Sequence, residues 1–178
     1  MRRWNSIVLA VALVSAGGCT SQPEFHDPFT RPQINWRPSV TLNLEAAERI
    51  LGSPSHLERD TAYLDDGTRA YQSAFHDDSA DPVTGKTGIV YFMHEEYETA
   101  NAARSFLDST LRANHVNPAE GIRTEGGAEL HYLTGGRVVR MVMVLKGNHL
   151  MRLKVNPVTS RYSLDELQKV ARELATQL

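Results

Sequence analysis

The sequence has almost no cysteine and no apolar run long enough to cross a membrane. Cys19 is the only cysteine among the 178 residues, so the chain cannot close a disulfide within itself. The longest apolar run extends from Ile7 to Ala16, about half of the roughly 20 residues that a spanning helix needs. The folded part must therefore be held together by its hydrophobic core.

The chain has no excess of positive charge. The chain carries 19 Lys and Arg against 21 Asp and Glu, a net charge of −2. Without the first eighteen residues the balance becomes 17 against 21, because Arg2 and Arg3 are lost. Proteins that bind nucleic acid need a basic footprint, so a nucleic-acid partner is excluded, and so is a generally polybasic membrane-binding surface.

The N-terminal residues have the pattern of an export signal. Arg2 and Arg3 precede the apolar run, and Gly17 and Gly18 follow it, which is typical of a secretory signal peptide. The segment Ala16-Gly17-Gly18-Cys19 resembles the lipobox of bacterial lipoproteins. This resemblance implies that residues 1–18 are removed and that Cys19 is acylated, with palmitate-type chains that hold it in the lipid bilayer. Thr20 follows instead of the aspartate that marks inner-membrane retention, which implies the periplasmic face of the outer membrane if the host has two membranes.

Residues 19–38 are interpreted as a lipidated, proline-rich tether. Four of the eight prolines lie in this stretch, and an extended segment of this kind reaches roughly 55–60 Å. Phe25, Phe29, Ile34 and Trp36 interrupt it. These apolar side chains either pack back onto the edge of the domain or dock a partner.

Residues 39–178 are predicted to form a single α+β domain. Helices are expected at 44–51, where Asn43 can cap the start and Gly52 the end, at 99–113, and at 164–177, where Ser163 and Glu166 form a capping box. Strands are expected at 69–75, 88–94, 128–134, 137–145 and 149–155. The order α-β-β-α-β-β-β-α predicts an antiparallel sheet of about five strands with three helices.

Two expected hairpin turns, Gly135-Gly136 and Gly147-Asn148, determine which side chains share a face. They place Leu145 opposite Leu150 and Leu130 opposite Met141. Both faces are then largely apolar, so the second face must be covered by helices or the tether, by a second copy or partner, or by a ligand. The candidate partner or ligand surface consists of Val142, Val144, Met151, Leu153, Arg140 and Trp36.

Motifs that carry chemistry are missing or incomplete. Gly85-Lys86-Thr87 resembles the end of a phosphate-binding loop, but Ala80 stands where its first glycine belongs. The seven histidines have no recognised ligand spacing, so no metal and no cofactor are expected. The acidic loop 76–81 either holds calcium or is simply solvated, and the second interpretation is favoured. The chain contains no Gly-x-Ser-x-Gly motif, and no catalytic residue is assigned.

Basic residues are concentrated in the last two expected strands, with no acidic residue between them. They either meet an anionic glycan or phospholipid headgroup, or pair with acidic loops elsewhere, and pairing is favoured. The residues are Arg137, Arg140, Lys146, Arg152 and Lys154.

The stretch from Leu44 to Pro54, followed by Tyr71 in a strand, resembles the start of small envelope lipoproteins related to the outer-membrane assembly factor BamE. The match covers about a third of the chain, and the whole pattern is more similar to assorted lipoprotein domains found across bacteria. We expect a non-enzymatic accessory lipoprotein that binds another envelope protein, with a homodimer as a further option. The alternatives are an extracytoplasmic small-ligand sensor, a protein inhibitor, or a hydrolase with a concealed site.

Overall fold

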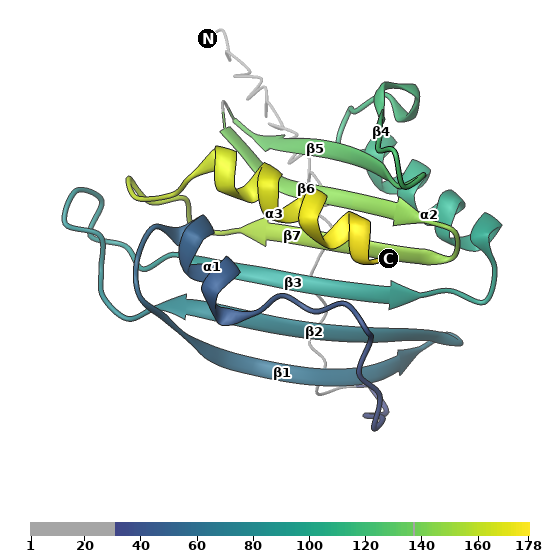
Figure 1. Cartoon of the computed structure of the whole chain (residues 1–178), viewed down its shortest axis with the longest axis horizontal. Coiled ribbons are helices and arrows are strands. Elements are labelled where there is room, and N and C mark those ends of the chain that lie inside the picture. The colour runs from purple at the N-terminus through teal and green to yellow at the C-terminus, as the bar shows by residue number, and fades with distance from the viewer. Residues whose placement is uncertain (1–30, 137) are drawn as a thin grey trace, which may run out of the picture.

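The computed structural model describes residues 31–136 and 138–178, and these form an α+β fold around one antiparallel sheet (Figure 1). The sheet has seven strands rather than about five, in the order β1-β2-β3-β7-β6-β5-β4. The helices are α1 (Leu44–Leu51), α2 (Ala100–Ala113), α3 (Leu164–Gln177) and the short 3-10 helix η2 (Pro118–Glu120). The strands are β1 (Ser55–Asp65), β2 (Thr68–Asp77), β3 (Ile89–Glu96), β4 (Ile122–Arg123), β5 (Glu129–Gly135), β6 (Val138–Lys146) and β7 (His149–Val155).

Helices cover both faces of the sheet. α1 and α3 lie side by side on one face, called face A, and α2 lies on the opposite face, called face B (Figure 1). The core under α1 and α3 includes Phe92, Val142 and Met151, and the smaller core under α2 includes Met143 and Leu150. Helices on both faces were one of the expected reasons why both sides of the sheet are apolar.

The ends of the helices follow the capping signals in the sequence. The Asn43 side chain accepts a hydrogen bond of 2.8 Å from the backbone N–H of Ala46, and Ser163 accepts one of 3.2 Å from that of Glu166. Gly52 ends α1 with φ of 70°, a conformation that glycine adopts without strain. A Cβ at this position would also lie 2.2 Å from the Arg161 carbonyl oxygen, so both the backbone and its surroundings require glycine.

Strand β1 was not expected from the sequence. It lies at the edge of the sheet, five of its eleven residues are exposed, and its apolar residues do not alternate cleanly with polar ones. It joins β2 through Asp66 and Gly67, whose φ angles are 47° and 79°. Two positive φ angles define a type I′ hairpin turn, for which Asp-Gly is a preferred sequence. The turn pair was thus the signal that could have revealed β1.

One of the two predicted hairpin registers is confirmed and the other is wrong. Leu145 pairs with Leu150, as expected around Gly147-Asn148. In the other hairpin, Gly135 pairs with Val138, and an irregularity between Leu133 and Thr134 adds one residue. Leu130 therefore lies opposite Val144 and not Met141, and it contributes to the core of face A.

The described end of the tether is built into the edge of the sheet. The backbone N–H of Ile34 donates to the Ala62 carbonyl at 3.0 Å, and that of Leu64 donates to the Pro32 carbonyl at 3.0 Å. Ile34 and Trp36 pack against the core of face A, which supports the interpretation that apolar tether residues pack back onto the domain. Residues 1–30, which include the predicted signal peptide, Cys19, Phe25 and Phe29, lie outside the described residues. Among the described helices, none combines the length and apolar character that crossing a membrane requires.

Candidate functional site

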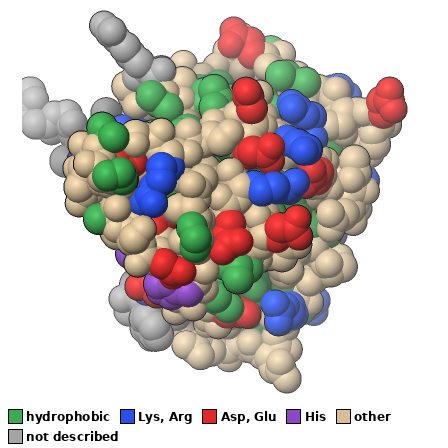
Figure 2. Space-filling view, turned by 60° about the vertical axis from the view of Figure 1, so that its left-hand side comes forward, with side chains coloured by type: hydrophobic (Ala, Val, Ile, Leu, Met, Phe, Trp, Pro, Cys, Tyr) green, Lys and Arg blue, Asp and Glu red, His purple; other side chains and the backbone are tan. Residues whose placement is uncertain are grey.

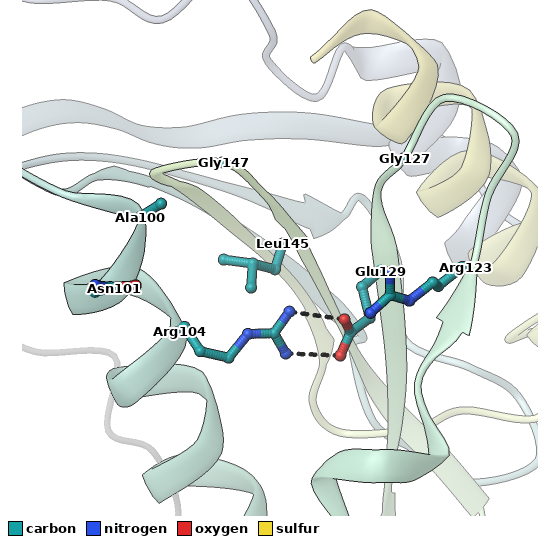
Figure 3. Close-up of a pocket in the computed structure, with 8 residues that line it drawn as sticks. All are labelled: Ala100, Asn101, Arg104, Arg123, Gly127, Glu129, Leu145 and Gly147. Atoms are coloured by element: carbon teal, nitrogen blue, oxygen red, sulfur yellow. Dashed lines mark hydrogen bonds and ion pairs between the residues drawn. The ribbon is translucent and has the colours of Figure 1, made fainter.

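The strongest cluster of buried charge joins α2 to β5 (Figure 3). Arg104 of α2 donates two hydrogen bonds, of 2.8 and 2.7 Å, to the two carboxylate oxygens of Glu129, the first residue of β5. His131, two residues further along the same face of β5, places its Nε2 2.6 Å from Oε1 of Glu129. Because a carboxylate can only accept, His131 carries its proton on Nε2. The side chains of Glu129 and His131 are 9% and 1% exposed.

Two open hollows flank this ion pair. One, of about 270 Å³, is lined by the start of α2, Gly127, Leu145 and the β6–β7 turn, and Figure 3 shows Arg104 and Glu129 meeting across it. The other, of about 280 Å³, lies towards Pro118 and Gly121. Arg123 lines both hollows. The site therefore presents a neutralised ion pair at its floor and one further arginine at its rim.

The electrostatics of the cluster favour a structural role for Glu129. Hydrogen bonds from Arg104, aided by His131, lower the pKa of Glu129 from 4.5 to about 2 in spite of its burial. The carboxylate is thus ionised at neutral pH and bonded through both oxygens, which makes it a poor proton acceptor. Its role is to join α2 to the sheet, and the Arg104–Glu129 ion pair with His131 is called the clamp below.

The chain approaches the clamp closely at Gly121. A Cβ on Gly121 would lie 2.6 Å from His131 Nε2 and 2.7 Å from Glu129 Oε1. Only a glycine allows the two side chains to pack against the backbone at this point. The spacing of Glu129 and His131 on one face of a strand was visible in the sequence, whereas the contribution of Arg104 from a distant helix was not.

Two buried aspartates organise the loop between β2 and β3. Asp77 accepts hydrogen bonds from the Ser53 hydroxyl and from the backbone N–H of Gly88. Asp81, 0% exposed, accepts from the backbone N–H groups of Val83 and Thr84 and from both the N–H and the hydroxyl of Ser160. These bonds, led by that of the Ser160 hydroxyl, hold the pKa of Asp81 well below its ordinary value. Asp81 thus ties the loop to the segment before α3.

Two of the histidines, His94 and His149, form a hydrogen-bonded pair. His94 on β3 places Nδ1 3.2 Å from the Val40 carbonyl and Nε2 3.1 Å from Nδ1 of His149 on β7. The carbonyl accepts, so His94 is protonated on Nδ1 and its Nε2 accepts from His149. Burial lowers the pKa of His94. Within residues 31–136 and 138–178, no three His, Cys, Asp or Glu side chains gather where they could hold a metal ion.

Four of the sequence-predicted surface residues are core residues. The side chains of Val142, Val144, Met151 and Leu153 are 0–1% exposed under α1 and α3, so they offer no surface to a partner. The sequence could not show that two helices from opposite ends of the chain converge on this face.

The other two predicted surface residues remain accessible in part. Trp36 is half-buried, and its ring meets that of His94 edge-on with centroids 6.1 Å apart. Arg140 is half-buried on β6 and lines a small hollow together with Lys154. The structure therefore does not bring the six predicted residues together into one site.

Charge pairing within the fold is extensive. Arg152 of β7 lies 2.7 Å from the Glu95 carboxylate of β3, and Arg49 of α1 lies 2.7 Å from that of Glu173 in α3. Acidic and basic side chains also lie next to one another over the face drawn in Figure 2. Among the basic residues that the sequence singled out, Arg152 thus pairs with an acidic residue, which lies on a neighbouring strand and not in a loop.

The chain matches no protein-family model, no curated protein and no solved structure. The function is therefore argued from the sequence and the geometry alone.

Proposed function

We propose that this protein is a non-enzymatic lipoprotein of the bacterial envelope that holds its domain near a membrane and binds another envelope protein. One observation carries the proposal: the chain that follows Cys19 is joined to β1 by two backbone hydrogen bonds, in which Ile34 donates to Ala62 and Pro32 accepts from Leu64. A lipid on Cys19 would thus be connected to a fixed point on the sheet edge. Such a connection would keep the domain close to the membrane, as an accessory protein that binds a membrane-associated partner requires.

The tether length limits where the domain can act. Twelve residues lie between Cys19 and Pro32, and the 13 steps from Cys19 to Pro32, at about 3.1 Å each in an extended chain, reach roughly 40 Å. An acylated cysteine anchors stably because each buried methylene contributes about 0.8 kcal/mol. The domain would therefore act within roughly 40 Å of the bilayer. If the host has two membranes, we propose that this bilayer is the outer membrane.

The buried carboxylates are better suited to a structural role than to catalysis. Glu129, Asp77 and Asp81 each accept hydrogen bonds from other parts of the chain, which fits groups that hold elements together. The hollows beside Glu129 open to solvent, whereas a small-ligand sensor is expected to enclose its ligand. The sensor, inhibitor and hydrolase alternatives receive no specific support from these features.

Fractionation of host cells tests the anchor. The native protein is expected in the membrane fraction, and Cys19→Ala is expected to move it to the soluble fraction because the acyl chains are lost. Ser21→Ala, which leaves the cysteine in place, is the matched control. A Cys19→Ala protein that still sediments with membranes would overturn the lipoprotein interpretation.

Photocrosslinking in cells tests partner binding. A photoreactive residue would be placed at exposed apolar positions in different parts of the surface, namely Leu57 and Leu64 on β1, Val83 in the β2–β3 loop and Ile122 on β4. We expect one discrete adduct from one region of the surface, and its loss in the Cys19→Ala background. Absence of adducts at all four positions would contradict an envelope protein partner.

A further inference from the structure

A third hollow lies on face A, where the chain before α1 passes over the first two strands (Figure 1). Its volume is about 290 Å³, and residues 33–37 line it together with residues of β1 and β2. Ile34 donates to the Ala62 carbonyl, and Gln33 bridges to Tyr63 in the antiparallel sense, so backbone contacts fix this wall. The hollow is thus formed before any ligand arrives, which lowers the entropic cost of binding.

Trp36 gives the hollow an aromatic wall. It is half-buried and packs against the core of face A. Its ring meets that of His94 edge-on, and His94 is itself held by the Val40 carbonyl and by His149. The orientation of the indole is therefore restrained while part of it stays accessible. Among the described residues that line the hollows beside Glu129 there is no aromatic ring, so this feature distinguishes the third hollow.

The strand side of the hollow carries a carboxylate that can accept further hydrogen bonds. Asp60 of β1 forms a long ion pair of 3.7 Å with Arg37, and their side chains are 32% and 68% exposed. Burial, and then the hydrogen bond to Asp60, raise the pKa of Tyr71 to about 12, so the phenol stays protonated and donates to this carboxylate. Since a carboxylate has about four acceptor sites, Asp60 can accept from a ligand as well.

The charges of the hollow balance one another. Among the described residues that line it, Arg37 and Asp60 are the charged ones, and they have opposite signs. Asn35 and Gln33 add exposed carboxamides, each with N–H donors and a carbonyl acceptor. An uncharged ligand with many hydroxyl groups and an amide fits this lining better than an anion or a cation does.

We propose that this hollow binds one N-acetylhexosamine unit of an uncharged glycan. The C–H face of the sugar ring stacks on Trp36, because the face of an aromatic ring is its negative side. The sugar hydroxyls donate to Asp60 and accept from Arg37, and the acetamido group pairs with the carboxamide of Asn35. Ligand pockets measure about 300–1,000 Å³, so a hollow of about 290 Å³ suits a single ring. The hollow is open to solvent, which lets the neighbouring sugars extend from it.

Tryptophan fluorescence of the full chain tests the site, independently of any protein partner and of acylation at Cys19. Trp4→Phe leaves Trp36 as the only tryptophan, and the protein would be purified in a detergent without a sugar headgroup. The probe is chitotetraose, a linear oligomer of N-acetylglucosamine. A saturable blue shift with a Kd below about 1 mM is expected, because stacking removes water from the indole. A weaker or absent response would overturn the proposal.

Asp60→Asn is expected to weaken the binding of chitotetraose at least about tenfold, because a charged acceptor forms hydrogen bonds roughly twice as strong as a neutral one. Asp78→Asn is the matched control. It makes the same change at an exposed position beside His56, outside the hollow, and should leave the Kd unchanged. Equal weakening by the two variants would overturn the site.

Calorimetry tests the two other recognition elements. Trp36→Leu removes the aromatic wall and is expected to weaken the binding of chitotetraose at least about threefold. Circular dichroism checks that this variant is folded, and Asp60→Asn, on the exposed edge strand, decides the test if it is not. Cellotetraose, which has similar rings without acetamido groups, is expected to bind the parent chain at least about fivefold more weakly. Equal affinity for the two sugars would overturn the assignment to N-acetylhexosamine.

Discussion

Arg104 and Glu129 are joined by two parallel hydrogen bonds that fasten α2 to β5, 25 residues further along the chain. Both oxygens of Glu129 are occupied by Arg104, and Oε1 is shared with His131. The fork of a guanidinium matches the carboxylate geometrically, so such a pair fixes direction as well as distance. The carboxylate thus helps to fix the position of α2 on face B, together with the apolar contacts that Leu107 and Leu111 make in the core of this face.

Glu129→Gln is expected to lower the free energy of unfolding by about 2 kcal/mol, because hydrogen bonds to charged groups contribute about 1.5–3 kcal/mol. Urea denaturation would measure the change. Arg112→Gln is the matched control. Arg112 is 69% exposed and forms a long ion pair of 3.9 Å with Asp108, and exposed pairs of this kind contribute about 0–1 kcal/mol. Equal effects of the two variants would contradict the clamp.

The clamp should also weaken in acid. The pKa of Glu129 is about 2 in the folded protein and 4.5 in its unperturbed state, so the unfolded chain takes up the proton first. Its stabilisation is present above about pH 4.5 and is lost as the pH falls towards about 2. The difference in unfolding free energy between the parent chain and Glu129→Gln should therefore shrink from about pH 6 to about pH 3. A difference that stays constant over this range would show that the carboxylate charge is irrelevant to the clamp.

The sequence correctly predicts the ends of helices and a hairpin turn, where one or two residues meet a local backbone requirement. Asn43 and Gly52 bound α1, and Ser163 begins α3, because caps satisfy backbone groups that the helix itself leaves free. β7 and its register with β6 follow from Gly147-Asn148 for the same local reason. Each of these signals acts within a few residues.

The sequence does not predict features that depend on distant segments. The extra residue near Leu133 shifts Leu130 to the other face, and nothing in the local pattern marks it. Val142 and Val144 look like a surface until α1 and α3 are known to meet over them. The Glu129 clamp needs Arg104 from another element, so only half of it could have been expected from the β5 sequence.

Asp81 is expected to control the opening of the β2–β3 loop. Its carboxylate holds Val83, Thr84 and Ser160 together, so Asp81→Ala should free the loop without unfolding the sheet. Trypsin cleavage after the exposed Lys86 is expected to accelerate at least tenfold, since the loss of even one to two hydrogen bonds shifts the opening equilibrium by about that factor.

Asp78→Asn is the control for the loop. Asp78 is exposed and pairs with His56 at the surface, so cleavage at Lys86 should change little in this variant. Circular dichroism should show unchanged secondary structure in both proteins. Rapid cleavage that is accompanied by loss of secondary structure would contradict a local role for Asp81.

Substitution by alanine is expected to have opposite effects at Gly67, in the β1–β2 turn, and at Gly126, between β4 and β5. Gly67 has φ of 79°, and a Cβ there would meet no atom within 4 Å, so Gly67→Ala carries only the backbone penalty of about 1 kcal/mol. Gly126 does not have a positive φ, and its Cβ would lie 3.9 Å from the nearest atoms. Gly126→Ala should therefore be neutral or stabilise by about 0.4–1 kcal/mol, because alanine restricts the unfolded chain. Urea denaturation of both variants would check this, and equal effects would show that the turn conformation at Gly67 does not limit the stability of the β1–β2 hairpin.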